Sequence, residues 1–186
     1  MSTITHWTSK DLETMPDDGT RYEIIEGELF MTRAPNSEHQ FVCNNLSFEL
    51  VAWSRKTKSG EVYFAPGLVF ADDDNVIPDL IWISKEKLIG ALDESGHFTV
   101  APELVIEVLS YGADDVRRDR AAKLDLYSRR GVQEYWIVDW RERKIEIYRR
   151  GSEQLSHSVT LSETDTLESP LLAGFQCLVG SIFEHV

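Results

Sequence analysis

Carboxylates within two apolar segments are the first residues whose position suggests chemistry. Glu107 stands inside the otherwise apolar run 104–109, and Asp79 follows Pro78 directly before a second apolar run. An ionised carboxylate in a buried strand is costly unless it is paired or binds a metal ion. Glu107 is therefore either part of a structural ion pair or a functional group. Asp79 is either a turn residue or a ligand at a strand end.

A metal ion and a lysine would complete such a site. Magnesium and manganese prefer oxygen ligands, often one or two carboxylates plus water, so Asp79 and Glu107 on neighbouring strands would suit either ion. Lys123 shares a helical face with Arg120 and Tyr127 by its spacing, and its ammonium can reach toward Glu107 if that helix packs on the sheet. A lysine beside metal-bound carboxylates stabilises negative charge or orients water. A surface lysine with its stem along the sheet is the alternative.

Strands and helices that would position these residues alternate along the chain. The turn Glu26-Gly27 has the length and type of a tight hairpin between strands over 21–25 and 28–32. Apolar spacing predicts helices over 37–54 and 114–130. Further strands are expected over 61–65, 67–71, 76–83, 104–109, 134–138, 144–149 and 155–161, with a short helix near 85–92. This order predicts an α/β (α+β) fold with one central mixed sheet, in a single domain over residues 1–186.

Composition narrows the class of protein. The chain has 186 residues and a net charge of −13, which argues against a tight, sequence-blind binder of nucleic acid. Residues 117–150 differ, with 11 basic and 6 acidic side chains, and form either a binding face or a solvated surface. No signal peptide and no membrane-length apolar segment is visible, so a cytoplasmic protein is expected. Cys43 and Cys177 are expected to be buried thiols.

Several motifs, taken together, resemble the Uma-two family of bacterial restriction-endonuclease-like proteins. They are Tyr22 to Leu29, Ser37-Glu38-His39, Pro78-Asp79, Glu107 to Ser110, Asp119 through Lys123 to Tyr127, and Gly131 to Asp139. The resemblance covers residues 8 to 183, nearly the whole chain. It implies the fold of the PD-(D/E)XK nuclease superfamily, a mixed central sheet flanked by helices with an N-terminal hairpin extension. It also implies magnesium- or manganese-dependent cleavage of phosphodiester bonds.

The resemblance also implies roles for individual residues. Asp79 and Glu107 correspond to the two acidic metal ligands of the superfamily. Glu23 matches its early acidic residue best, and Glu26 is the alternative. The implied catalytic set is therefore Asp79, Glu107, Lys123 and Glu23, the implied metal ligands are Asp79, Glu107 and Glu23, and possible accessory residues are Tyr127, His39 and Glu26.

The lysine is where this chain departs from the superfamily pattern. The superfamily lysine stands two positions after the second acidic residue, and this chain has Leu109 there. Within the Uma-two family the lysine is placed in the following helix, which points to Lys123. The departure leaves catalytic activity open, because a family fixes a fold more firmly than an activity.

Two functions from different classes follow. The first is a metal-dependent nuclease that acts on nucleic acid, with DNA favoured as the substrate. The second is an interaction module on a nuclease scaffold with little or no catalysis, which Leu109 and the net charge of −13 favour. Exposed sheet edges and the apolar tail over 171–186 leave a homodimer open under either function.

Overall fold

A six-stranded mixed sheet forms the centre of the molecule. The computed structural model describes residues 6–185. Within the sheet only β7 and β8 run parallel, and every other neighbouring pair is antiparallel. The strands are, in spatial order, β10 (Leu155–Ser162), β9 (Lys144–Arg150), β8 (Glu134–Asp139), β7 (Leu104–Val108), β6 (Leu80–Ser84) and β3 (Gly60–Phe64).

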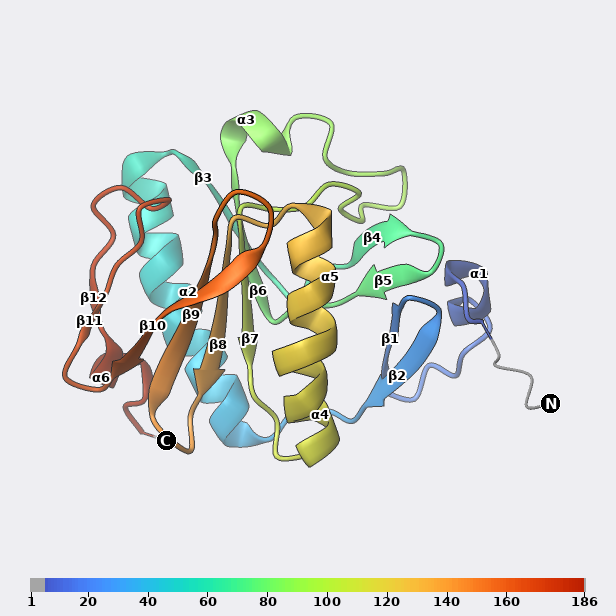
Figure 1. Cartoon of the computed structure of the whole chain (residues 1–186), viewed down its shortest axis with the longest axis horizontal. Helices are drawn as coiled ribbons and strands as arrows, with labels where there is room; N and C mark the ends of the chain where they lie inside the picture. The colour runs from blue at the N-terminus through green and yellow to red at the C-terminus, as the bar shows by residue number, and fades with distance from the viewer. Residues whose placement is uncertain (1–5, 186) are drawn as a thin grey trace.

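Helices cover both faces of this sheet (Figure 1). Helix α2 (Ser37–Thr57) lies on one face, and the other carries α4 (Ala113–Arg117), a π-helical turn (Arg118–Ala122) and α5 (Lys123–Arg130). The side chains of β7 point alternately toward these two layers of helices, because successive side chains of a strand lie on opposite faces of the sheet. Ile106 packs in the core beneath α2, whereas Val105 packs with Tyr127 of α5. Glu107 contacts Tyr127 and therefore also faces α5.

A smaller sheet lies beside the central one. It has the order β2 (Glu28–Thr32), β1 (Arg21–Ile25), β5 (Asp74–Val76), β4 (Leu68–Ala71), and the short helix α1 (Ser9–Leu12) lies near it (Figure 1). The turn between β1 and β2 has Glu26 at φ 52° and Gly27 at φ 75°. Two successive positive φ values match the twist of a two-residue hairpin, which confirms the predicted turn.

The C-terminal segment closes the core beneath α2. It contains β11 (Thr166–Leu167), β12 (Cys177–Leu178) and α6 (Val179–Ile182), and Phe175, Ile182 and Phe183 are buried. Asn45 of α2 donates a hydrogen bond to the Ile182 carbonyl at 3.1 Å. Most of the apolar tail therefore packs within its own chain, whereas Leu178 is 53% exposed.

The mixed sheet and the strand–helix–strand unit are confirmed, but several expected elements differ. The strand expected over 76–83 is two strands in different sheets, because Pro78, between the end of β5 and the start of β6, has no N–H to donate and ends the strand there. The hairpin thus belongs to a second sheet rather than to the central one. The helix expected over 85–92 is only α3 (Lys85–Leu88).

The remaining expectations concern thiols and membrane segments. Cys43 and Cys177 are both buried and free, as predicted. Within residues 6–185, no helix combines the length and the apolar composition that crossing a membrane would need.

Candidate functional site

Asp79 lies at the end of the central sheet, one residue before β6. Its Oδ2 accepts hydrogen bonds from the Val108 backbone N–H at 2.8 Å and from His39 Nε2 at 3.1 Å. Arg21 Nη1 lies 3.3 Å from the other oxygen, Oδ1. Burial opposes ionisation, but the hydrogen bond from His39, the charge of Arg21 and the hydrogen bond from the Val108 N–H lower the pKa of Asp79 to about 2. Asp79 is therefore ionised at neutral pH.

His39 links Asp79 to a buried thiol of the same helix. Its Nδ1 lies 3.6 Å from Cys43 Sγ, one helical turn along α2. Burial, reinforced by the negative charges of Asp79 and Glu107, raises the pKa of the Cys43 thiol, so Cys43 keeps its proton. The hydrogen-bond network then assigns Nδ1 as acceptor from Cys43 and Nε2–H as donor to Asp79. His39 thereby fixes the orientation of Asp79.

This trio is also a candidate metal group. Among the described residues, His39, Cys43 and Asp79 form the one set of three acidic, histidine or cysteine side chains with ligand atoms all within 4.8 Å. Both ring nitrogens of His39 already face protein partners. The geometry thus suits a hydrogen-bonded chain from Cys43 through His39 to Asp79.

Glu107 occupies the second part of the site, between β7 and α5. Its Oε1 accepts from Lys123 Nζ and from Tyr127 Oη, each at 2.8 Å. The contact between Lys123 and Glu107 that the sequence suggested is therefore present. Burial raises the pKa of Glu107 to about 8, and the negative charges of Asp79 and Asp119 add to this effect while Lys123 opposes it. Glu107 is the carboxyl that retains a proton near neutral pH.

Glu23 reaches the same lysine from the smaller sheet. Its Oε1 lies 2.9 Å from Lys123 Nζ and accepts the Ile77 backbone N–H at 2.8 Å. Its Oε2 is buried, receives no hydrogen bond and has Arg118 Nη1 at 3.8 Å. Burial opposes ionisation, yet the charges of Lys123 and Arg118 lower the pKa of Glu23. A single ammonium thus lies between two carboxyls, of which Glu23 carries the charge.

The π-helical turn contributes two residues that the sequence reasoning did not identify. The Lys123 N–H bonds the carbonyl of Arg118, five residues earlier, and this widened turn buries both Arg118 and Asp119. Asp119 Oδ1 lies 3.3 Å from Arg118 Nε and 3.8 Å from Lys123 Nζ. π-Helical turns occur frequently at functional sites. Asp119 was visible in the family motif, but its role was not.

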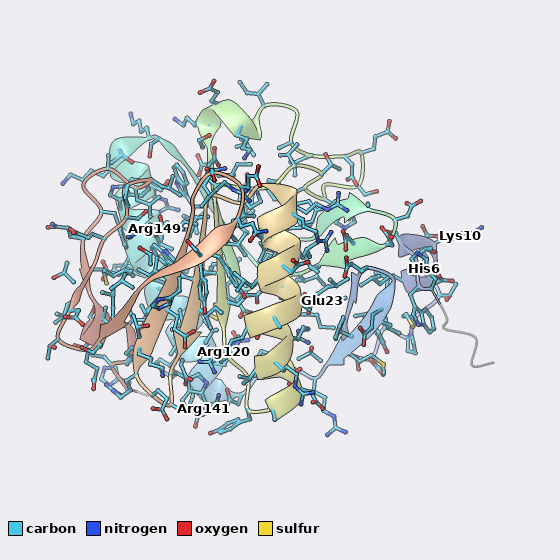
Figure 2. The ribbon with its side chains drawn as sticks, in the orientation of Figure 1. His6, Lys10, Glu23, Arg120, Arg141 and Arg149 are labelled. Atoms are coloured by element: carbon cyan, nitrogen blue, oxygen red, sulfur yellow. The ribbon has the colours of Figure 1, made fainter. Side chains whose placement is uncertain are left out.

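The prediction that Arg120 shares the face of Lys123 is wrong. Arg120 instead pairs with Glu146 at 2.6 Å and with Asp139 at 3.5 Å. Figure 2 shows Arg120 and Glu23 on opposite sides of the helix. The extra residue in the π-helical turn breaks the three-and-four spacing that holds in a regular α-helix. The face toward Glu107 therefore carries Asp119 where Arg120 was expected.

A small cavity of about 20 Å³ lies between the two parts of the site. Asp79, Glu107, Lys123 and His39 border it, whereas Glu23 and Tyr127 do not and contact Lys123 or Glu107 from behind. Of the predicted site residues, Glu26 alone lies away from this cluster. It is in the exposed hairpin turn, where it pairs with Arg129 at 3.2 Å. The structure also adds Arg21, Arg118 and Asp119 to the cavity wall.

The cavity and its acidic donors suit divalent ions that take oxygen ligands, and the cations Arg21, Arg118 and Lys123 also border it. Its volume suits a body the size of one water molecule, and carboxylate oxygens are the ligands that these ions prefer. Asp79 and Glu107 supply such oxygens at its wall. The buried Oε2 of Glu23, which lacks a hydrogen bond, is a further oxygen acceptor behind Lys123.

Ion pairs account for most of the positive charge over residues 117–150. Arg118 and Lys123 pair with the site carboxylates, and Arg130 pairs with Asp74. Arg149 lies 3.3 Å from Glu134. These side chains neutralise buried or partly buried acids, so the segment is not the free basic face that its composition allowed.

The fold and the acidic cluster place the chain among proteins built like restriction endonucleases. The family model Uma2, described as "Putative restriction endonuclease", matches residues 9–180, and the chain belongs to this family. Its fold is similar to the crystal structure of "a putative nuclease belonging to DUF820" from Anabaena variabilis ATCC 29413. That comparison gives a TM-score of 0.76 at 17% identity and covers 95% of this chain and 97% of the other. None of the curated proteins compared with the chain matches it.

Proposed function

We propose that the protein is a metal-dependent nuclease that cleaves phosphodiester bonds of nucleic acid, with DNA as the favoured substrate. One observation carries this proposal: Asp79 and Glu107 come from adjacent strands to the same cavity, where Lys123 lies 2.8 Å from Glu107. Two acids and a lysine at one strand end are the groups that metal-assisted phosphodiester hydrolysis needs. Membership of the family supports the same reaction class.

Asp79 and Glu107 would hold magnesium or manganese, with Glu23 as a further acidic group. When bound, the ion supplies Lewis acidity toward water and toward the phosphate oxygens. Burial beside other carboxylates disfavours the ionised form of Glu107. A cation bound at its oxygens would stabilise that ionised form.

The protein's own side chains have separate roles in this proposal. The Lys123 ammonium stabilises negative charge that develops on the phosphate. His39 holds Asp79 in one orientation, and Tyr127 holds Glu107 through Oε1. Burial raises the pKa of Glu107 to about 8, so Glu107 would release its proton when the ion binds.

One observation favours the second candidate, an interaction module without catalysis. The ionised carboxylates already have protein cations, since Arg21 pairs with Asp79 and Lys123 pairs with Glu23. A site that is neutralised internally has less need of a metal ion. The two candidates differ in one measurable property, the cleavage of nucleic acid in the presence of a divalent ion.

A cleavage assay separates them. Purified wild type is incubated with labelled linear DNA and RNA in magnesium, in manganese or in EDTA. We expect wild type to cleave in magnesium or manganese but not in EDTA. The Asp79→Asn variant should cleave at least about 100-fold more slowly. Asp17→Asn, which changes an exposed aspartate, is the matched control and should cleave as wild type does. Unchanged cleavage by a folded Asp79→Asn variant would contradict the assignment of the site.

A further inference from the structure

A wider hollow of about 370 Å³ adjoins the small cavity of the candidate site. The two share Thr32, Arg33, Pro35 and Ser110, so they lie side by side. We propose that this hollow receives an unpaired nucleotide, so that the preferred substrate is a single-stranded segment of nucleic acid. The inference rests on the proposed nuclease function and names the substrate class for the same site.

Tyr111 provides a stacking surface in the wall of the hollow. It follows β7 directly before α4, and 62% of it is exposed. Its ring meets Trp140 edge to face, with centroids 4.9 Å apart at 87°, and the Arg141 guanidinium lies 5.8 Å from its centroid. Trp140 is itself fixed, because its Nε1 donates to the Leu109 carbonyl at 2.9 Å. Tyr111 is thus an exposed ring that packs against the buried Trp140, which suits stacking on a base.

Met31 and Arg33 contribute complementary chemistry from β2 and the residues after it. Met31 is 65% exposed and borders the same hollow as Tyr111, so two large apolar side chains face solvent there. Together they offer apolar contact area to a base. Arg33 borders both cavities and is exposed, and among residues 6–185 no carboxylate lies within ion-pair distance of it. Its guanidinium is therefore available to a phosphate between the base in the hollow and the reacting group.

Asn36 adds a donor for the polar edge of a base. It borders the hollow, and its Oδ1 accepts the His39 N–H at 3.0 Å as the cap of α2. Its Nδ2 is buried and donates to no acceptor in the protein. An unsatisfied buried donor is costly, so a turn of the Asn36 side chain toward the hollow would gain a hydrogen bond with a base carbonyl or ring nitrogen.

The depth of the site favours an unpaired strand over a duplex. Asp79 is 3% exposed and Glu107 is 2% exposed, and Arg33 borders both the cavity that they line and the wider hollow. In a duplex the bases are stacked and paired, and their faces are not offered to a protein ring. An unpaired nucleotide presents its face to Tyr111 while its backbone bends inward. Stacking also depends less on net charge than duplex binding does, which suits a protein of charge −13.

Fluorescence anisotropy tests the inference in EDTA, where cleavage does not interfere. The probes are a fluorescein-labelled mixed-sequence strand of about 20 nucleotides, as DNA and as RNA, and the blunt duplex of the same DNA. We expect wild type to bind a single strand about ten-fold more tightly than the duplex, and Tyr111→Ala to lose about ten-fold in that binding. Tyr111→Phe keeps the ring and should bind as wild type. Phe48→Ala removes an exposed aromatic ring elsewhere and is the matched control.

The outcomes separate this inference from the nuclease proposal. Equal or tighter binding of the duplex, binding of no probe, or unchanged binding by Tyr111→Ala would each overturn the inference. Metal-dependent cleavage of duplex with single strands untouched would also overturn it and leave the nuclease function standing. Tyr111-dependent binding of single strands without cleavage in any metal would support the stacking site and reject the nuclease function.

Discussion

Asp79 and Glu107 border one cavity, yet their surroundings favour opposite protonation states. Asp79 accepts from a backbone N–H and from His39 and faces Arg21, and its pKa is lowered to about 2. Glu107 is equally buried, and there burial raises the pKa to about 8, because three other carboxyls add to its effect and only Lys123 opposes it. Burial is shared, so the difference comes from the neighbouring groups.

The difference assigns separate roles to two acids of similar chemistry. A carboxylate fixed by donors remains ionised and can serve as a constant metal ligand. A carboxyl with a raised pKa can exchange a proton when a cation arrives. Each prediction below changes one side of this contrast, in order of decreasing effect.

Removing the shared ammonium should have the largest effect on stability. Lys123→Met leaves the ionised Glu23 buried without its closest cation, which costs about 3–5 kcal/mol of unfolding free energy. Urea denaturation followed by circular dichroism measures the loss. Lys85→Met, on the exposed start of α3, is the control and should change stability by less than about 0.5 kcal/mol. A Lys123→Met protein as stable as wild type would show that the ion pairs of the site contribute little.

Neutral substitutions of the two acids should differ at pH 7. Asp79→Asn removes a charged acceptor from His39 and Val108 and should cost about 2–3 kcal/mol. Glu107→Gln keeps a carbonyl oxygen for Lys123 and replaces a carboxyl that is largely protonated, so it should cost less than about 1 kcal/mol. The same denaturation measurement compares them. Equal losses, or a larger loss for Glu107→Gln, would remove the contrast.

Stability should fall on both sides of an optimum near pH 5, toward higher pH because of Glu107 and toward lower pH because of Asp79. Between the ordinary pKa of 4.5 and the folded value of about 8, Glu107 binds more protons in the folded state. The unfolding free energy therefore falls as the pH rises from 5 to 8, by at most about 1.4 kcal/mol per pH unit for one group. Asp79 acts oppositely, because its lowered pKa contributes stability that is lost as the pH falls below 4 toward 2.

Denaturation midpoints of wild type and Glu107→Gln across this pH range test both signs. The variant should reduce the slope between pH 5 and 8 and leave the acid side unchanged. Stability of the wild type that rises over that range would contradict the protonated state of Glu107.

Thiol reactivity is the smallest expected effect. Cys43 is fully buried, and burial with the charges of Asp79 and Glu107 raises its pKa, so the native thiol should not react with a disulfide reagent. Two thiols per chain should react after unfolding in urea. Rapid reaction of Cys43 in the native protein would mean that the part of the site around Asp79 opens readily.

The main contacts of the site could be predicted because regular geometry fixes them. Pairing of β6 with β7 brings Asp79 beside Glu107, and a helix that returns over the sheet brings Lys123 to Glu107. Buried runs and turn residues in the sequence carry this information.

Contacts that depend on local irregularity could not be predicted. The π-helical turn places Asp119, rather than the expected Arg120, on the face of Lys123. Regular helical spacing does not reveal a π-helical turn. Arg21 reaches Asp79 from the smaller sheet, whose position beside the central one is a tertiary property. The thiol partner of His39 follows from one turn of α2, but its connection to Asp79 required the structure.

Calorimetric titration with manganese tests most directly whether Asp79 and Glu107 form a metal site. Titrations of wild type at pH 7, in two buffers with different ionisation enthalpies, report both binding and proton release. We predict that wild type binds manganese stoichiometrically and releases a proton from Glu107. Asp79→Asn should lose the binding, and Glu107→Gln should lose the proton release. A folded wild type that binds no manganese, or that binds it equally in both variants, would contradict the account.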